Sequence, residues 1–403
     1  MNNKKYILIS GGIVLALLLL FMMIPSKKSI SVEWPDSGLV TMDGDSIRLN
    51  VYIEDSGSMD GYMCDGSQLK DAVYSYISAL DSYCDTTNLF YINQKVIPYK
   101  SNIKGFVKDL TPIAFAKAGG NRANSDISEM FSALLDDMTP NSVVIFVSDC
   151  ILDVPDGDAA HFWHLKQTDI RNTFNSALNK YPNLSVEVFR LESLFTGNYY
   201  YTHGHEKLSG VLRPYFMFVI GSKENLSYLN DKVPFEEIQH GIKNYFAFST
   251  LGQVNYEFTN SFGMNKGNSC SSYPQKGSAI VRLQLNMRPT LQDDAYLSDI
   301  QNYVLNSSDI FINNIASVNN KKSPYSHVIT LAIDENIKPS EGILILKTAK
   351  FPSWLEAAND ETGQDIQNNL DKTTGIKYII NGIAESYKNY DELAKIIFTV
   401  GKK

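Results

Sequence analysis

The chain has 403 residues, of which 44% are hydrophobic and 11% aromatic, and its formal net charge is -8. A chain of this length can form two domains, or one large domain with a smaller one beside it. The negative net charge argues against nucleic acid as a partner, because nucleic-acid binding favours a basic surface.

An apolar segment near the amino terminus, residues 6–24, contains no charged residue. It approaches the length of about 20 apolar residues that a helix needs to cross a bilayer. The residues after it, Met22 to Lys28, do not resemble a signal-peptide cleavage site. We therefore expect residues 1–28 to be an uncleaved transmembrane signal-anchor. Lysines flank the segment on both sides, so the orientation rests on its short amino-terminal tail, which favours an extracytoplasmic (periplasmic) soluble part.

The rest of the chain divides by its hydrophobic pattern. Residues 29–45 carry Pro35, glycines and serines and are expected to be a linker. From 46 to 235, segments with strand and helix periodicity alternate, which predicts an α/β domain with a doubly wound, mostly parallel sheet. From 236 to 403 the pattern changes to short apolar strands between polar loops. We expect a β-rich, sandwich-like accessory region that ends in a helix and a strand.

Oxygen-bearing side chains follow two of the predicted strands. The first strand runs into Glu54-Asp-Ser56-Gly-Ser58, and the apolar strand 142–147 runs into Ser148-Asp149. Ser125 follows a loop that contains two glycines. The carboxyl ends of parallel strands meet at one edge of a sheet, so these side chains are expected to lie together. Hydroxyl and carboxylate oxygens suit a hard divalent cation, Mg²⁺ first, with Mn²⁺ or Ca²⁺ as alternatives.

These motifs resemble the von Willebrand factor A (vWA) domain with its metal-ion-dependent adhesion site (MIDAS). The family pattern is Asp-x-Ser-x-Ser after the first strand, a Thr in a later loop and an Asp after the central strand. Here Glu54 stands for the first Asp and Ser125 for the Thr, while Ser56, Ser58 and Asp149 match. The resemblance implies a non-enzymatic bacterial scaffold whose partner protein offers an Asp or Glu as the last metal ligand.

Other interpretations remain open. The same acidic site could serve a metal-dependent hydrolase that uses Glu54 or Asp149, or the protein could be a structural envelope protein whose metal site is degenerate. Ser56 to Met59 could also be a simple strand-to-helix turn. Cys64 and Cys84 could form a disulfide in an exported domain, although spacing alone does not show it.

Two further clusters lie between the predicted strands. His161, His164, His203 and His205 could in principle build a zinc or copper site. The run Tyr199–Tyr201 is consistent either with core packing or with an exposed aromatic patch for a protein partner.

Overall fold

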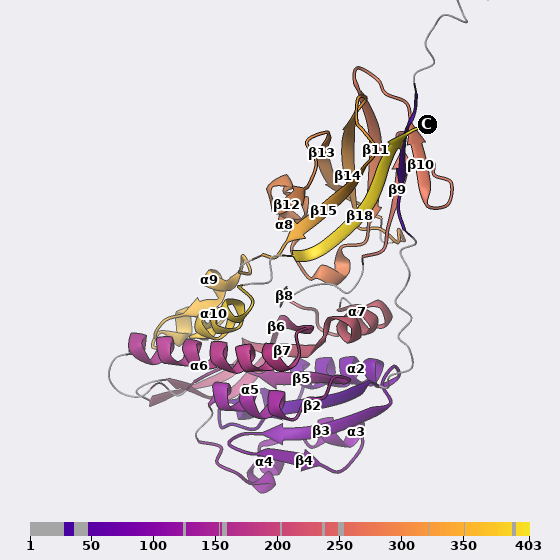
Figure 1. Cartoon of the computed structure of the whole chain (residues 1–403). Helices are drawn as coiled ribbons and strands as arrows, with labels where there is room; N and C mark the ends of the chain where they lie inside the picture. Colours follow the sequence, from indigo (N-terminus) through magenta and orange to yellow (C-terminus); the bar gives the residue numbers. More distant parts are fainter. Residues whose placement is uncertain are drawn as a thin grey trace, which may run out of the picture.

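The computed structural model forms two bodies, an α/β body and a β-sandwich that lies above it in the view of Figure 1. The described residues are 28–35, 47–123, 126–152, 154, 159–201, 204–235, 238–248, 254–320, 322–349, 351–388 and 392–403. Element labels follow Figure 1.

The α/β body is built on a seven-stranded sheet with the order β4-β3-β2-β5-β7-β6-β8. Only β3, β2 and β5 run parallel to one another, and β4, β7, β6 and β8 pair antiparallel with their neighbours. The bounds are β2 Arg48–Glu54, β3 Thr86–Ile92, β4 Val96–Tyr99, β5 Ser142–Ser148, β6 Leu184–Tyr201, β7 Gly204–Ser222 and β8 Asn244–Phe248.

The predicted doubly wound, mostly parallel vWA sheet is therefore wrong. Parallel neighbours need a crossover connection, usually a helix. No helix separates β6 from β7, so the two strands pair as an antiparallel hairpin, and β7 then lies antiparallel to β5. The result is a mixed sheet with a parallel centre.

Helices cover both faces of this sheet. On one face the core contains Leu69 of α2, Phe106 of α3 and Leu226 of α7. On the other face it contains Phe131 of α5 and Ile379 of α10, together with residues of α6. The bounds are α2 Gln68–Asp81, α3 Ile103–Lys108, α4 Pro112–Ala118, α5 Ile127–Asp136, α6 Ala159–Lys180, α7 Lys223–Lys232 and α10 Ile376–Ser386, with the 3-10 helix η1 at Met59–Met63.

The sandwich consists of a five-stranded sheet, β10-β1-β18-β15-β12, and a four-stranded sheet, β13-β14-β11-β9. Its strands are β1 Ile30–Glu33, β9 Tyr256–Asn260, β10 Ser269–Ser272, β11 Ser278–Leu285, β12 Tyr303–Leu305, β13 Ile310–Ser317, β14 His327–Asp334, β15 Ser340–Lys347 and β18 Glu392–Lys402. The short helices η3 Arg288–Thr290, α8 Asp294–Ser298 and η4 Ile300–Asn302 connect them.

Two described segments that are far apart in the sequence, β1 and β18, lie side by side in the sandwich. β1, which falls within the segment expected to be a linker, pairs antiparallel with β18 from Ile30↔Lys402 to Glu33↔Thr399. Between β15 and β18 the chain returns to the α/β body through α9 Leu355–Ala358, β16 Asn359–Asp360, η5 Ile366–Asn368, β17 Thr373–Thr374 and α10. Each body therefore contains segments that are distant in the sequence.

The predicted single-pass membrane topology is not supported. Within the part of the chain that the structure describes, no helix is both long enough and apolar enough to span a bilayer. The predicted span, residues 6–24, lies outside the described residues.

Two buried arginines of the α/β body fasten residues 359–374, which we call the strap. Arg213 of β7 is only 1% exposed. Its Nη1 donates to the carbonyls of Asn369, Leu370 and Lys372 at 3.1, 2.7 and 2.9 Å. Arg190 of β6 donates to the carbonyl of Asp371. These charge-assisted bonds hold four consecutive strap residues against the β6–β7 hairpin.

Replacing Arg213 with Met is expected to lower the free energy of unfolding by about 2–4 kcal/mol, because three half-buried carbonyls of the strap lose their charged donor. Urea unfolding monitored by circular dichroism measures the loss. Lys207→Met, at an exposed position of β7, is the matched control and should change stability by less than about 0.5 kcal/mol. Equal stability of the two variants would contradict the fastening role of Arg213.

Candidate functional site

A pocket of about 510 Å³ opens where β2 and β5 end. Its volume falls in the range of about 300–1,000 Å³ that is usual for ligand pockets. Hydroxyl, charged, aliphatic and aromatic groups share its lining, which consists of Ser56, Gly57, Ser58, Asp60, Arg122, Ala123, Ile151, Leu152, Tyr200, Tyr201 and Gly204.

The parallel pairing of β2 with β5 sets the position of the first acid. Ile53 is paired with Val147, so Glu54 and Ser148 follow side by side. The Ser148 hydroxyl donates to Glu54 Oε2 and accepts from the backbone N–H of Cys150 at 2.8 Å. Glu54 is buried and is not among the residues that line the pocket. Asp149, which follows Ser148, is likewise buried and is not a lining residue.

The two serines of the motif lie in the pocket wall. Ser56 Oγ and Ser58 Oγ are 2.9 Å apart, and Ser56 Oγ accepts from the backbone N–H of Met59 at 3.4 Å. The hydroxyl pair is placed by the turn into η1, directly after β2. Two hydroxyl oxygens at this separation can face a common ligand.

Asp149 lies next to this pair and is completely buried, with 0% exposure. Its Oδ1 accepts from the backbone N–H of Ile151 at 3.1 Å, and the Ser58 hydroxyl donates to the carboxylate. Its Oδ2 has no hydrogen-bond partner among the described residues. Burial raises the pKa of Asp149 to about 6, although Ile151, Ser58 and the charge of Arg213 oppose the shift.

The backbone turns sharply immediately after this acid. Cys150 has a φ of +57°, which is uncommon for a residue with a side chain. Such conformations persist where the surrounding structure enforces them, and they cluster at functional sites. The turn directs Ile151 and Leu152 toward the pocket.

The structure thus brings Ser56, Ser58 and Asp149 together, and it places Glu54 beside Ser148 at the end of the same two strands. Ser125 lies outside the described residues. The described residues contain no group of three or more His, Cys, Asp or Glu side chains placed to hold a metal ion. The predicted MIDAS centre and the vWA assignment are therefore not supported, and what the structure shows is a smaller set of two hydroxyls with one carboxylate.

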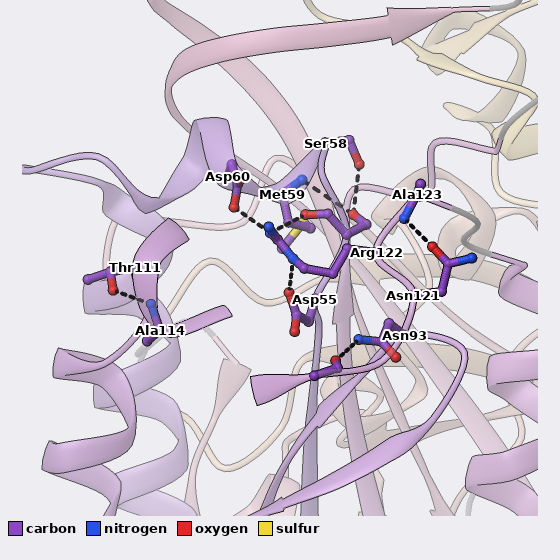
Figure 2. Close-up of polar contacts among 12 residues, drawn as sticks. Asp55, Ser58, Met59, Asp60, Asn93, Thr111, Ala114, Asn121, Arg122 and Ala123 are labelled. Atoms are coloured by element: carbon purple, nitrogen blue, oxygen red, sulfur yellow. Dashed lines mark hydrogen bonds and ion pairs between the residues drawn. The ribbon is translucent and has the colours of Figure 1, made fainter. Parts of the chain in front are cut away.

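Arg122 and its two carboxylates were not predicted from the sequence. Its Nε donates to Asp55 Oδ1 and its Nη2 to Asp60 Oδ1, each at 2.5 Å, and Nη2 also reaches the carbonyl of Ser56 at 3.0 Å. Figure 2 shows the guanidinium between the two acids. The Gly57 N–H in turn donates to the carbonyl of Arg122 at 3.2 Å. Arg122 thereby joins the 119–123 loop to the loop that follows β2.

Asp55 depends on this arginine. It is 0% exposed, and burial raises its pKa to about 6 while the hydrogen bond and the charge of Arg122 lower it. The sequence carried no local signal for the pair, because Asp55 and Arg122 are 67 positions apart.

The tyrosine run, the histidines and the two cysteines singled out in the sequence have different outcomes. Tyr199 is buried, whereas Tyr200 and Tyr201 line the pocket. No metal-binding cluster of histidines is found among the described residues, and His203 lies outside them. Cys64 and Cys84 are both free thiols, so the disulfide considered from the sequence is not formed.

A second polar cluster lies in the sandwich. His327 Nδ1 is 3.0 Å from Ser326 Oγ, and its Nε2 is 3.1 Å from Asp294 Oδ1. The order resembles a hydrolytic triad. However, Ser326 Oγ accepts from the Met287 N–H at 2.7 Å, and both Ser326 and His327 are buried. The geometry fits a structural role for the cluster.

Arg122→Ala is expected to lower the free energy of unfolding by about 3 kcal/mol at pH 8, because it leaves Asp55 buried without a cation. The folded-state pKa of Asp55 already exceeds its unfolded value and rises further in the variant. The penalty of ionised Asp55 therefore grows as pH rises, and the loss should be much smaller at pH 5. Urea unfolding at both pH values measures it. The double variant Arg122→Ala/Asp55→Asn should recover part of the loss at pH 8, and a loss independent of pH would contradict this explanation.

Comparison with known proteins identifies no family for the chain. No protein-family model matches the chain, and no curated protein matches it either. The functional interpretation consequently depends on the geometry of the pocket.

Proposed function

We propose that the chain is a non-enzymatic protein-binding module whose pocket receives an acidic side chain of a partner protein through a bound Mg²⁺ ion. The observation that carries the proposal is Asp149 Oδ2, a fully buried carboxylate oxygen without a described hydrogen-bond partner. Leaving such an atom unpaired is costly. Asp55 Oδ2 is unpaired as well, but Asp55 has Arg122 as its cation, whereas Asp149 has no ion-pair partner among the described residues and is hydrogen-bonded to Ser58, which lines the pocket. We infer that a bound cation completes Asp149.

The chemistry of the neighbouring groups fits a hard divalent cation. The candidate ligands are the Ser56 and Ser58 hydroxyls and the Asp149 carboxylate, all oxygens, which Mg²⁺ prefers and which Mn²⁺ or Ca²⁺ also accept. A cation bound there supplies an open coordination position for the partner's carboxylate. Glu54, held by Ser148, is placed to add negative charge nearby.

The charge balance points the same way. Asp60 and Arg122 line the pocket, and three further carboxylates and one further guanidinium lie next to the residues that do, so the formal charge of this group, when fully ionised, is -2. The acids are Glu54, Asp55, Asp60 and Asp149, and the bases are Arg122 and Arg213. A divalent cation offsets this charge, and it would also favour the ionised form of Asp149, which burial disfavours.

A binding role is favoured over hydrolysis by the groups available in the pocket. A metal-dependent hydrolase needs a general acid or base close to the ion. The described lining residues include no histidine, and the acid that does line the pocket, Asp60, is ion-paired with Arg122.

The full-length protein is expected to bind Mg²⁺ in isothermal titration calorimetry. Asp149→Asn and Ser56→Ala should each weaken binding at least about tenfold, because the first removes the negative charge of a ligand and the second removes a ligand oxygen. Ser82→Ala, at an exposed site at the end of α2, should bind as the unmutated protein does. Binding should also be weaker at pH 5 than at pH 7.5, because protonation of Asp149, whose pKa is about 6, competes with the cation. Absence of binding, or unchanged binding by Asp149→Asn, would overturn the proposal.

A further inference from the structure

One wall of the pocket comes from the part of the β6–β7 hairpin that extends beyond the sheet. β5 pairs with β7 only from Phe216 to Ile220, and β8 pairs with β6 only from Val186 to Arg190. Residues 191–201 and 204–215 continue as a two-stranded structure, which we call the ribbon. Its far end supplies Tyr200, Tyr201 and Gly204 to the pocket.

The ribbon is anchored along its length. Near its base, Gln68 Oε1 of α2 accepts from the Leu194 N–H at 2.7 Å. Further along, Phe195 packs so closely on Gly61 that an added Cβ there would lie 2.2 Å from the ring. Toward the far end, Tyr199 Oη is 2.9 Å from Thr374 Oγ1 of the strap. These contacts from two sides make the ribbon a fixed wall of the pocket.

Strand alternation then directs Tyr200 outward. Tyr199 is 1% exposed and Tyr200 is 40% exposed, as expected for successive residues on opposite faces of a strand. A Cβ added to Gly57 would lie 3.7 Å from both Cε2 and Oη of Tyr200. The ring therefore lies against the residue between the two motif serines. Ile151 and Leu152 contribute apolar surface to the same pocket.

Building on the proposed function, we propose that the pocket recognises two neighbouring side chains of its partner, an acid and an aromatic residue. The acid is bound through the Mg²⁺ ion held by Ser56, Ser58 and Asp149, and the aromatic ring packs on Tyr200. A pocket of about 510 Å³ has more room than one carboxylate needs. Aromatic pairs also gain stability beyond simple area burial, with offset or edge-to-face geometry. Tyr200 is thus the specificity-determining residue of the site.

The test uses four short peptides, acetylated and amidated, with the full-length protein in saturating Mg²⁺. Two carry the acid beside an aromatic residue in either order (Gly-Asp-Phe and Phe-Asp-Gly), and two carry Ala in place of Phe. Binding is followed by calorimetric titration, or by nuclear magnetic resonance line broadening where affinity is low. At least one Phe peptide should bind about two- to tenfold more tightly than its Ala counterpart.

Tyr200→Ala should abolish the preference for Phe over Ala and leave Mg²⁺ binding unchanged, whereas Tyr200→Phe should retain the preference. Equal binding of Phe and Ala peptides by the unmutated protein, with Mg²⁺ binding intact, would overturn this inference alone. Mg²⁺ binding without binding of any peptide would also overturn it. Absence of Mg²⁺ binding would overturn the proposed function and this inference with it.

Discussion

The parallel pairing of β2 with β5 is the constraint on which the candidate site depends. Because the two strands run in the same direction and in register, both end at one edge of the sheet, with Glu54 beside Ser148. The motif serines and Asp149 follow immediately, and both loops reach the same pocket. A shift of one residue in this register would turn the side chains at the strand ends toward the opposite face.

Buried charged side chains are the second organising feature, and they differ in the groups that they contact. Arg213 is compensated by strap carbonyls and lies close enough to Asp149 to lower its pKa. Asp55 is compensated by Arg122, which also joins two loops of the pocket. Asp149 has no cation within hydrogen-bond distance among the described residues, and its Oδ2 is unpaired, as are Asp55 Oδ2 and two nitrogens of Arg213. Within that part of the chain, Asp149 therefore differs from Asp55 in having no ion-pair partner, and it is next to the hydroxyl of Ser58.

The sequence predicted the parts of the fold that local patterns encode. The apolar run at 142–147 correctly indicated the strand β5, which is buried along its whole length. The sequence also showed directly that Ser56 and Ser58 follow β2 and that Asp149 follows β5. The direction of β7 and the pairing of β1 with β18 could not be predicted, because they depend on contacts between residues far apart in the chain. The same holds for Arg122, whose carboxylate partners lie more than 60 positions away, and for the ribbon that brings Tyr200 to the pocket.

The most direct test of the central claim is a crystal structure of the full-length protein soaked in Mn²⁺, with anomalous diffraction recorded to locate the ion. The account predicts an anomalous peak in the pocket, coordinated by the Ser56 and Ser58 hydroxyls and with Asp149 in its coordination sphere, directly or through water. A pocket without manganese, or manganese bound only by other residues, would contradict it.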